Sequence, residues 1–316
     1  MRKIMSQKIS IAILLCALLC AFTFESFAQS SKPIQKPEEA LLKSGYEAFL
    51  KGNFEKAMAN FSKAIEINPQ YADAYYARGS IYDFKQDHGK AIADYSKSIQ
   101  ISPKDAKVYN SRGMAYFIKK DYDKAIADFS KFVEINPKDE PPVLIEMVYF
   151  FRGSAYSENK DYDRAIADFS KAIQLAPQPQ VGNNYVGRGL AYQGKKDNDK
   201  AIADFSKAIE LNPKDAEVYI LRESAYTDMK DYDKATADYS KVIEINPQYG
   251  NAYIARGLAY DENKDYDKAI AYYSKAIQIN PQNKIAYYYR AKAYRAVGKN
   301  DSAAADEKKG FELNSK

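Results

Sequence analysis

Hydrophobic and polar positions along this chain form two amphipathic patterns that recur as a pair. In residues 109–116 the repeated positions stand at i, i+3, i+4 and i+7, and in 125–133 at i, i+1, i+4, i+7 and i+8. Each spacing is typical of an α-helix with one buried face. Between them Asp121 fits an N-cap, and Pro137 ends the second pattern because proline disfavours a helical conformation at Asn136. The pattern therefore predicts two helices per period.

The helix pair recurs at a usual spacing of 34 residues. Arg-Gly dipeptides mark the first helix and begin at Arg78, Arg112, Arg152, Arg188 and Arg256. Alanine fills one column of the second helix in all eight periods: Ala57, Ala91, Ala125, Ala165, Ala201, Ala235, Ala269 and Ala303. A repeat this short cannot bury its own apolar face, so neighbouring repeats must stack to form a continuous core.

These columns resemble the tetratricopeptide repeat (TPR) family, whose pattern is Trp-x2-Leu-Gly-x2-Tyr, then Ala-x3-Phe, then Pro. Here Tyr stands for Trp and Arg for Leu, over about residues 38–316. The resemblance implies an all-α fold: an α-solenoid forming a right-handed superhelix of about eight helix-turn-helix repeats, with the first helices lining a concave face. The repeats are expected near 38–71, 72–105, 106–145, 146–181, 182–215, 216–249, 250–283 and 284–316.

Departures from the repeat lie beside repeat four and at the ends. Extra residues at 138–145 and 178–181 flank repeat four and predict a local break in the superhelix. In repeat eight, Glu307 replaces the aromatic of the second helix and Ser315 replaces the proline. Such polar substitutions favour a terminal cap that faces solvent.

Residues 1–28 have the three-part pattern of a secretory signal peptide. A basic start is followed by an apolar stretch from Ile9 to Phe24 and by the small-x-small site Ser26-Phe27-Ala28. We expect cleavage after Ala28 and a flexible linker over 29–37, with the mature protein periplasmic or extracellular. Together with the repeats, this start resembles a bacterial exported TPR protein.

Two alternatives to simple cleavage remain open. An uncleaved anchor is disfavoured because the apolar stretch is shorter than the roughly 20 residues that span a bilayer. A lipid anchor at Cys20 is the other alternative, although Leu19 is not the small residue that lipoprotein motifs place there. After cleavage we expect neither a transmembrane segment nor, since Cys16 and Cys20 leave with the signal, any thiol chemistry.

The mature chain offers no electrostatic footprint for nucleic acid. Removing three basic residues and one acidic residue with the signal lowers the formal net charge from +5 to +3. This small charge is spread over the whole array, so we expect no nucleic-acid partner.

Six arginines of the first helices are each followed, 16 residues later, by an aspartate of the second helix. We predict structural ion pairs, each arginine reaching an aspartate of its own repeat or of the preceding one. The alternative is a row of anion-binding arginines. The predicted pairs are Arg78 with Asp94, Arg112 with Asp128, Arg152 with Asp168, Arg188 with Asp204, Arg222 with Asp238, and Arg290 with Asp306. Repeat seven has Arg256 without the acid, which Tyr272 replaces.

The residues that catalysis or metal binding would need are missing from the pattern. The chain has one histidine, His88, in a column that holds tyrosine in other repeats, so we interpret it as a packing residue. The Asp-Tyr-Asp-Lys runs lack the central glycine and distal glutamate of a calcium loop. We expect no catalytic residues, no metal site and no cofactor, and therefore no enzyme.

The concave face is the predicted partner-binding surface, because the exposed positions of the first helices are unusually apolar there. Some of these side chains could instead pack against adjacent first helices. The predicted partner-binding residues are Tyr76, Phe84, Asn110, Met114, Phe117, Ile118, Met147, Phe150, Phe151, Tyr288, Tyr289 and Arg295. The apolar segment 141–145 is a second, weaker candidate, as a lip at the start of repeat four.

The sequence thus predicts a non-enzymatic scaffold that binds a peptide or helix of a protein partner in a concave groove, outside the cytoplasm. A glycan-associated envelope protein is the alternative, since 28 tyrosines are present and tyrosine stacks on sugar rings. Most of those tyrosines fall in core columns, which weakens the alternative. Neither the partner nor the oligomeric state follows from the residues.

Overall fold

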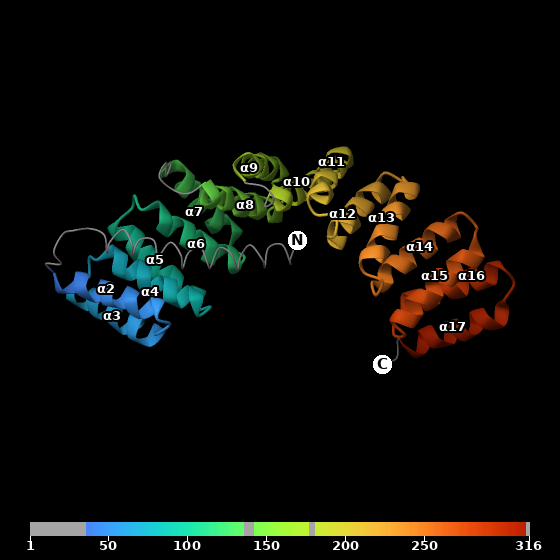
Figure 1. Cartoon of the computed structure of the whole chain (residues 1–316), viewed down its shortest axis with the longest axis horizontal. Helices are drawn as coiled ribbons and strands as arrows, with labels where there is room; N and C mark the ends of the chain where they lie inside the picture. The colour runs from blue at the N-terminus through green and yellow to red at the C-terminus, as the bar shows by residue number, and fades with distance from the viewer. Residues whose placement is uncertain (1–35, 136–141, 177–180, 314–316) are drawn as a thin grey trace. The chain divides into compact units, whose positions relative to one another are not determined.

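The structure is a computed structural model that describes residues 36–135, 142–176 and 181–313. The predicted signal peptide and nearly all of the predicted linker lie outside these residues. The described residues form sixteen helices and no strand (Figure 1). In chain order they are α2 (Pro37–Leu50), α3 (Phe54–Ile67), α4 (Ala72–Phe84), α5 (His88–Ile101), α6 (Ala106–Ile118), α7 (Tyr122–Ile135), α8 (Pro142–Glu158), α9 (Tyr162–Leu175), α10 (Val181–Gly194), α11 (Asn198–Leu211), α12 (Ala216–Asp228), α13 (Tyr232–Ile245), α14 (Gly250–Glu262), α15 (Tyr266–Ile279), α16 (Lys284–Ala296) and α17 (Asn300–Glu312).

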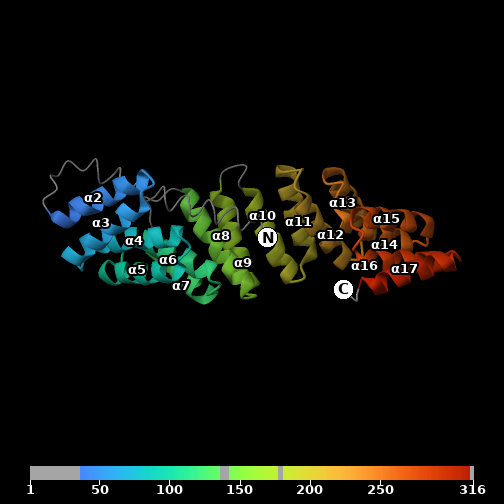
Figure 2. The ribbon, with the colours of Figure 1, turned by 90° about the horizontal axis from the view of Figure 1, so that it is seen from below.

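The helices group into two compact bodies, and each is built of helix pairs. The N-terminal body ends at Gln180 and holds repeats one to four, while the C-terminal body starts at Val181 and holds repeats five to eight. Within each body every helix packs on the one that follows it (Figures 1 and 2). First helices of successive repeats also touch, as α6 and α8 do. The boundary between the bodies falls in the second of the two insertions.

Close approach of the two helices in a repeat depends on glycine and alanine. An added Cβ at Gly113 would lie 2.9 Å from the ring of Phe129, and one at Gly257 would lie 2.4 Å from the ring of Tyr273. A larger residue at either glycine would force the aromatic ring out of its place. The column alanines, such as Ala125 and Ala269, are fully buried beside these rings. The predicted helix pairs are therefore confirmed, down to their small-residue contacts.

Helix ends follow the repeat as well. Asp161, Asp197 and Asp231 accept a hydrogen bond from the backbone N–H three residues on, which satisfies an otherwise unpaired donor. The Asp121 carboxylate accepts a hydrogen bond from Nζ of Lys124 at 2.6 Å. The turn before each such aspartate needs a left-handed residue. Six internal repeats place a non-glycine there, with φ from 60° to 64°, whereas the first and last repeats use glycine.

All six predicted arginine–aspartate pairs are present, each within its own repeat. Arg112 donates from Nε and Nη2 to the two carboxylate oxygens of Asp128 at 2.8 and 2.7 Å. Arg290 binds Asp306 in the same way at 2.7 and 2.8 Å. Hydrogen bonding to the acid raises the pKa of the Arg290 guanidinium above its usual value. These arginines are thus engaged, which argues against a row of free anion sites.

The third arginine nitrogen reaches the preceding repeat through a contact that the sequence analysis missed. Nη1 of Arg112 donates to the hydroxyl of Ser96 at 3.0 Å, and Nη1 of Arg290 donates to Ser274 at 2.9 Å. Each of these arginines joins its own second helix to the second helix before it. The pair therefore supports both the repeat and its stacking.

In repeat seven, which lacks the aspartate, the arginine packs against two tyrosine rings. The Arg256 guanidinium lies 4.6 Å from the ring centroid of Tyr272, which stacks on Tyr260 with centroids 5.3 Å apart. The buried Nε of Arg256 has no hydrogen-bond partner among the described residues. Cation–π contact is here the main compensation for the guanidinium charge.

Candidate functional site

Seven of the twelve predicted partner-binding residues are buried, so the prediction that they form an open groove surface is wrong. All seven lie in the first helices of the N-terminal body: Tyr76, Asn110, Met114, Phe117, Met147, Phe150 and Phe151. Partner binding by these residues would need the core to open.

The physical reason is the close packing of adjacent first helices. Phe117 of α6 meets Phe151 of α8 edge to face, with centroids 5.3 Å apart. Phe150 lies against the ring of Phe169 in the same repeat at 5.6 Å. Side chains on the flank of one first helix are thus covered by the first helix of the next repeat. The predicted lip segment is partly buried: Leu144 is buried and Val143 is exposed, while Pro141 lies outside the described residues.

Two predicted residues of the N-terminal body keep some exposure. Phe84 is 47% exposed at the end of α4 and rests on Phe54 at a centroid distance of 4.8 Å. Ile118 is half-buried. They are separate positions at the C-terminal ends of α4 and α6.

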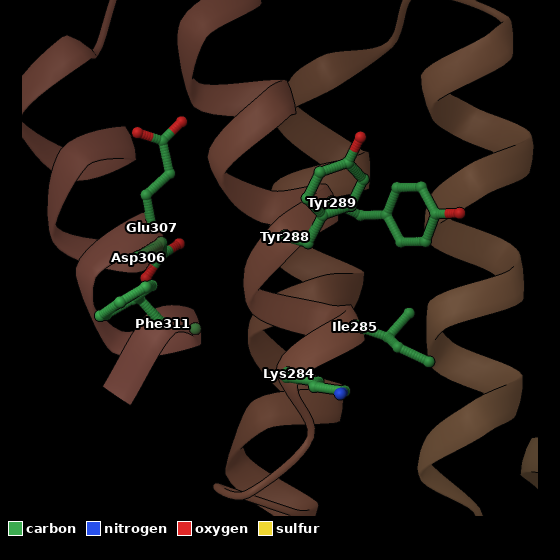
Figure 3. A pocket seen from close by; sticks show the side chains of 8 residues that line it. Lys284, Ile285, Tyr288, Tyr289, Asp306, Glu307 and Phe311 are labelled. Carbon is green, nitrogen blue, oxygen red and sulfur yellow. The ribbon is translucent and has the colours of Figure 1, made fainter. Parts of the chain in front are cut away.

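The three predicted residues of α16 lie together at a hollow in repeat eight. Tyr288 and Tyr289 line a cavity of about 510 Å³ between α16 and α17, and Arg295 binds a carboxylate at its edge. Figure 3 shows α16 carrying Lys284, Ile285 and both tyrosines, opposite Asp306, Glu307 and Phe311 of α17. The lining residues are Lys284, Ile285, Tyr288, Tyr289, Asp306, Glu307, Gly310 and Phe311. We call this surface the end face.

At the end face, repeat eight departs from the repeat in two packing columns, and no described helix follows α17 to cover it. Glu307 stands in the column of the buried aromatic, and Gly310 in a column that holds alanine in most repeats. What remains is apolar and open: Phe311 is 75% exposed, Tyr288 64% and Ile285 52%. The expectation of a polar cap is therefore wrong for this face, although Glu307 itself is exposed as predicted.

Repeat seven shows what normally covers such a surface. The residues 34 positions before the end face include Ile254, Tyr273 and Ala276, and all three are buried. The first helix of repeat eight, α16, covers them, with Tyr289 stacked on Tyr273 at a centroid distance of 5.9 Å. No helix of the described residues covers the corresponding surface of repeat eight.

Charges at the end face are satisfied within the chain. Arg295 donates to both carboxylate oxygens of Glu307 at 2.8 and 2.7 Å. These hydrogen bonds lower the pKa of Glu307 below its usual value, so the pair stays ionised at neutral pH. Asp306 is bound by Arg290. The surface left for a partner is thus mainly aromatic and aliphatic.

The one histidine of the chain lies in α5, and its ring contacts a carboxylate. His88 Nδ1 lies 2.6 Å from a carboxylate oxygen of Asp83, which accounts for the lone imidazole as a packing residue. Within the described ranges, no three His, Cys, Asp or Glu side chains are grouped to hold a metal ion. None of the helices described is both long and apolar enough to span a bilayer.

Solved structures share the architecture. A tetratricopeptide repeat protein from Parabacteroides merdae is 20% identical, with a TM-score of 0.54 over 81% of this chain and 98% of that one. The C-terminal part of a TPR repeat-containing protein from Cytophaga hutchinsonii is 21% identical, with a TM-score of 0.65 over 77% and 96%. At this identity the likeness shows the fold alone.

One curated relative matches a short stretch. An uncharacterised protein of Methanocaldococcus jannaschii is 49% identical over 41 residues, which are 13% of this chain and 48% of that protein. The chain thus spans about half the length of the curated relative that it matches.

Family models for these repeats match most of the chain. Models described as "TPR repeat" or "Tetratricopeptide repeat" match residues 45–83, 72–105, 106–139, 147–179, 185–215, 224–264, 250–283 and 272–305. Such repeats form scaffolds for protein–protein interaction. The matched residues and the helix pairs agree: the chain belongs to the tetratricopeptide repeat family.

Proposed function

We propose that this protein is a non-enzymatic scaffold that binds an α-helix of a protein partner on the end face. The observation that carries the proposal is a large apolar surface left open where the preceding repeat has a helix. Three large side chains, Ile285, Tyr288 and Phe311, are more than half exposed around one cavity. A contiguous exposed apolar patch of this kind marks an interaction surface.

The helix that covers repeat seven indicates which partner chemistry fits. Helix α16 places Ala286, Tyr289 and Ala293 against repeat seven, at i, i+3 and i+7. Small residues allow close approach of the helix axes, while the tyrosine fills the space between them. We therefore expect the partner helix to be amphipathic, with small residues and one aromatic on its contact face. We expect no charged residue on that face, because the charges of the end face are already paired within the chain.

Export is part of the proposal and rests on sequence. The basic, apolar and small-x-small segments of residues 1–28 support cleavage after Ala28 and a partner outside the cytoplasm. Intact mass of the protein purified from its native cells tests this directly. A mass that begins at Gln29 supports export, a lipid-modified Cys20 would place the protein on a membrane surface, and an intact Met1 would contradict export.

Apart from Tyr232 and Tyr288, which are exposed, the tyrosines of the repeats give the glycan hypothesis little structural support. In the repeats they pack against basic groups, as Tyr149 does beneath Arg152 at 5.4 Å and Tyr116 beneath Lys124 at 5.3 Å. Rings held in this way are not free to stack on sugars. The hypothesis stays a prediction that the structure does not favour.

Site-directed photo-cross-linking tests the proposed site. A photoreactive phenylalanine analogue replaces Phe311 in one variant and Phe84 in a matched control, since both are exposed aromatics at helix ends. We expect a single partner protein to cross-link at 311 and not at 84. Cross-linking only at 84 would move the site to the N-terminal body, and an adduct of two copies of this chain would replace the partner proposal with self-association.

Affinity for the purified partner completes the test. Changing Tyr288→Ser and Phe311→Ser together should weaken binding at least about tenfold, because aromatic anchors carry most of the binding free energy of such interfaces. The control Phe84→Ser should leave the Kd unchanged. Circular dichroism checks that both variants stay folded, which is expected since about half or more of each of the three side chains is exposed. Equal affinity of the double variant and the native protein would reject the end face.

A further inference from the structure

Repeat six carries a glutamate where close packing demands a small residue. Seven repeats have glycine or alanine in this column, at Gly45, Gly79, Gly113, Gly153, Gly189, Gly257 and Ala291, and the exception is Glu223. In those glycine repeats an added Cβ would meet the facing helix, in most cases within 3 Å of the partner ring. Glu223 therefore cannot coexist with an aromatic ring in the usual position.

The ring in repeat six has indeed left its usual environment. In the aromatic column the side chains of Phe205 and Tyr273 are fully buried, whereas Tyr239 is only half-buried. Burial and the neighbouring Glu223 carboxylate raise the pKa of the Tyr239 hydroxyl above its usual value. The Thr227 hydroxyl donates to Oε1 of Glu223 at 2.7 Å.

This displacement leaves a hollow of about 210 Å³ among α12, α13 and α14, entirely within the C-terminal body. Glu223 and Thr227 line it from α12, Tyr232 and Tyr239 from α13, and Glu262 from α14. Apolar residues such as Leu258 complete the wall. The hollow is separate from the end face, which α16 and α17 form.

Two carboxyl groups, those of Glu223 and Glu262, line the hollow. Glu223 is 7% exposed, and burial, with smaller contributions from Asp228 and Asp238, raises its pKa. The adjacent Arg222 is fully engaged, because it binds both carboxylate oxygens of Asp238 and also Ser206. No lysine or arginine of the described residues lines the hollow.

We propose that this hollow is a binding site for an organic cation, the ammonium or guanidinium group of a lysine or arginine side chain or of a small amine. The carboxylates of Glu223 and Glu262 would receive its N–H groups, and the aromatic ring of Tyr232, 43% exposed, lies at the same wall to face the charge. The apolar wall formed by Leu258 and its neighbours suits an alkyl stem. Neither the end face nor its partner is needed for this site.

Methyl NMR spectroscopy with side-chain mimics tests the proposal. The probes are propylguanidinium chloride and butylammonium chloride, with uncharged N-propylurea as the control of matched shape. We expect saturable shifts of the methyl signals of Thr227, Ala255 and Leu258 with either cation and none with the urea. Equal shifts with the urea, or no saturable shift with either cation, would overturn the proposal.

Three variants separate the charge of Glu223 from its packing. Glu223→Gln keeps the side-chain shape and should weaken cation binding about tenfold, the usual effect of losing a charge-assisted contact. Glu262→Gln, at an exposed position that does not endanger folding, should weaken binding by a smaller factor. Asp233→Asn removes an exposed carboxylate of α13 that does not line the hollow, and should change nothing. Unchanged affinity in both glutamate variants would show that the cation binds elsewhere.

Discussion

Repeats seven and eight are built on the same columns, yet one surface is closed and the other open. In repeat seven, Tyr273 and Ala276 lie buried beneath the following first helix, whereas in repeat eight the same columns hold Glu307 and Gly310 beside an open cavity. The arginine–aspartate pair differs in the opposite direction: repeat eight has the pair, and repeat seven lacks it. The two repeats are therefore stabilised by different sets of contacts, and the apolar surface of repeat eight is left uncovered by the described helices.

Replacing the buried aromatic of repeat seven with the glutamate that repeat eight carries should have the largest effect on stability. Tyr273→Glu places a carboxylate in a position with no exposure and removes a ring that packs on Gly257 and Tyr289. We expect a loss of about 4 kcal/mol in the free energy of unfolding. Urea unfolding followed by circular dichroism measures it. A loss below about 1 kcal/mol would mean that the ring column does not hold the repeats together.

The arginine column gives the next contrast. Asp306→Ala leaves Arg290 without its carboxylate in a mostly buried site, and should cost about 3 kcal/mol. Arg256→Ala in repeat seven breaks no ion pair and should cost only about 1 kcal/mol. The double variant Arg290→Ala, Asp306→Ala should lose less than the sum of its single changes. Strict additivity in the unfolding free energies would exclude coupling.

The buried hydroxyl of Tyr273 is the basis of a smaller predicted effect in repeat seven. The Tyr273 hydroxyl is buried and has no hydrogen-bond partner among the described residues. Tyr273→Phe should therefore stabilise the protein by about 1 kcal/mol, since an unsatisfied buried group costs about that much. The thermal midpoint should rise, with Tyr272→Phe, in a half-buried position, as the comparison. A lower midpoint for Tyr273→Phe would mean that the hydroxyl has a partner after all.

The smallest expected effect is in the turn between the two helices. Lys264 has a φ of 60° in repeat seven, where repeat eight has Gly298 at 77°. A left-handed conformation costs a lysine more than a glycine, so Lys264→Gly should stabilise by about 0.5 to 1 kcal/mol after the greater entropy of the unfolded chain is subtracted. Gly298→Lys should destabilise by a similar amount in urea unfolding. A lower stability for Lys264→Gly, or a higher stability for Gly298→Lys, would contradict the role of this turn.

Much of the fold follows from the sequence because strict columns report contacts within one helix pair. The alanine column and the arginine–aspartate spacing led directly to confirmed contacts such as Arg112 with Asp128. The link from Arg112 to Ser96 was missed, although a serine column 16 residues before most of the arginines would have revealed it.

The site was harder to predict because exposure depends on the neighbouring helix. Phe117 and Phe151 have the periodicity of an outer face, but the closeness of α6 and α8 buries them against each other. Tyr288 occupies the column of the buried Ile254 and is open only because no described helix covers it. A pattern along one helix cannot show which of its sides another helix will cover.

Covering the end face with a further helix tests most directly whether this surface binds the partner. Ile279 and Leu313 occupy equivalent positions, so a second copy of residues 280–296 joined after Leu313, in place of 314–316, would bring a further first helix over the end face in register. We predict that the extended protein unfolds at a higher temperature and binds the cross-linked partner at least about tenfold more weakly. Full affinity for the partner with this helix in place would contradict the account.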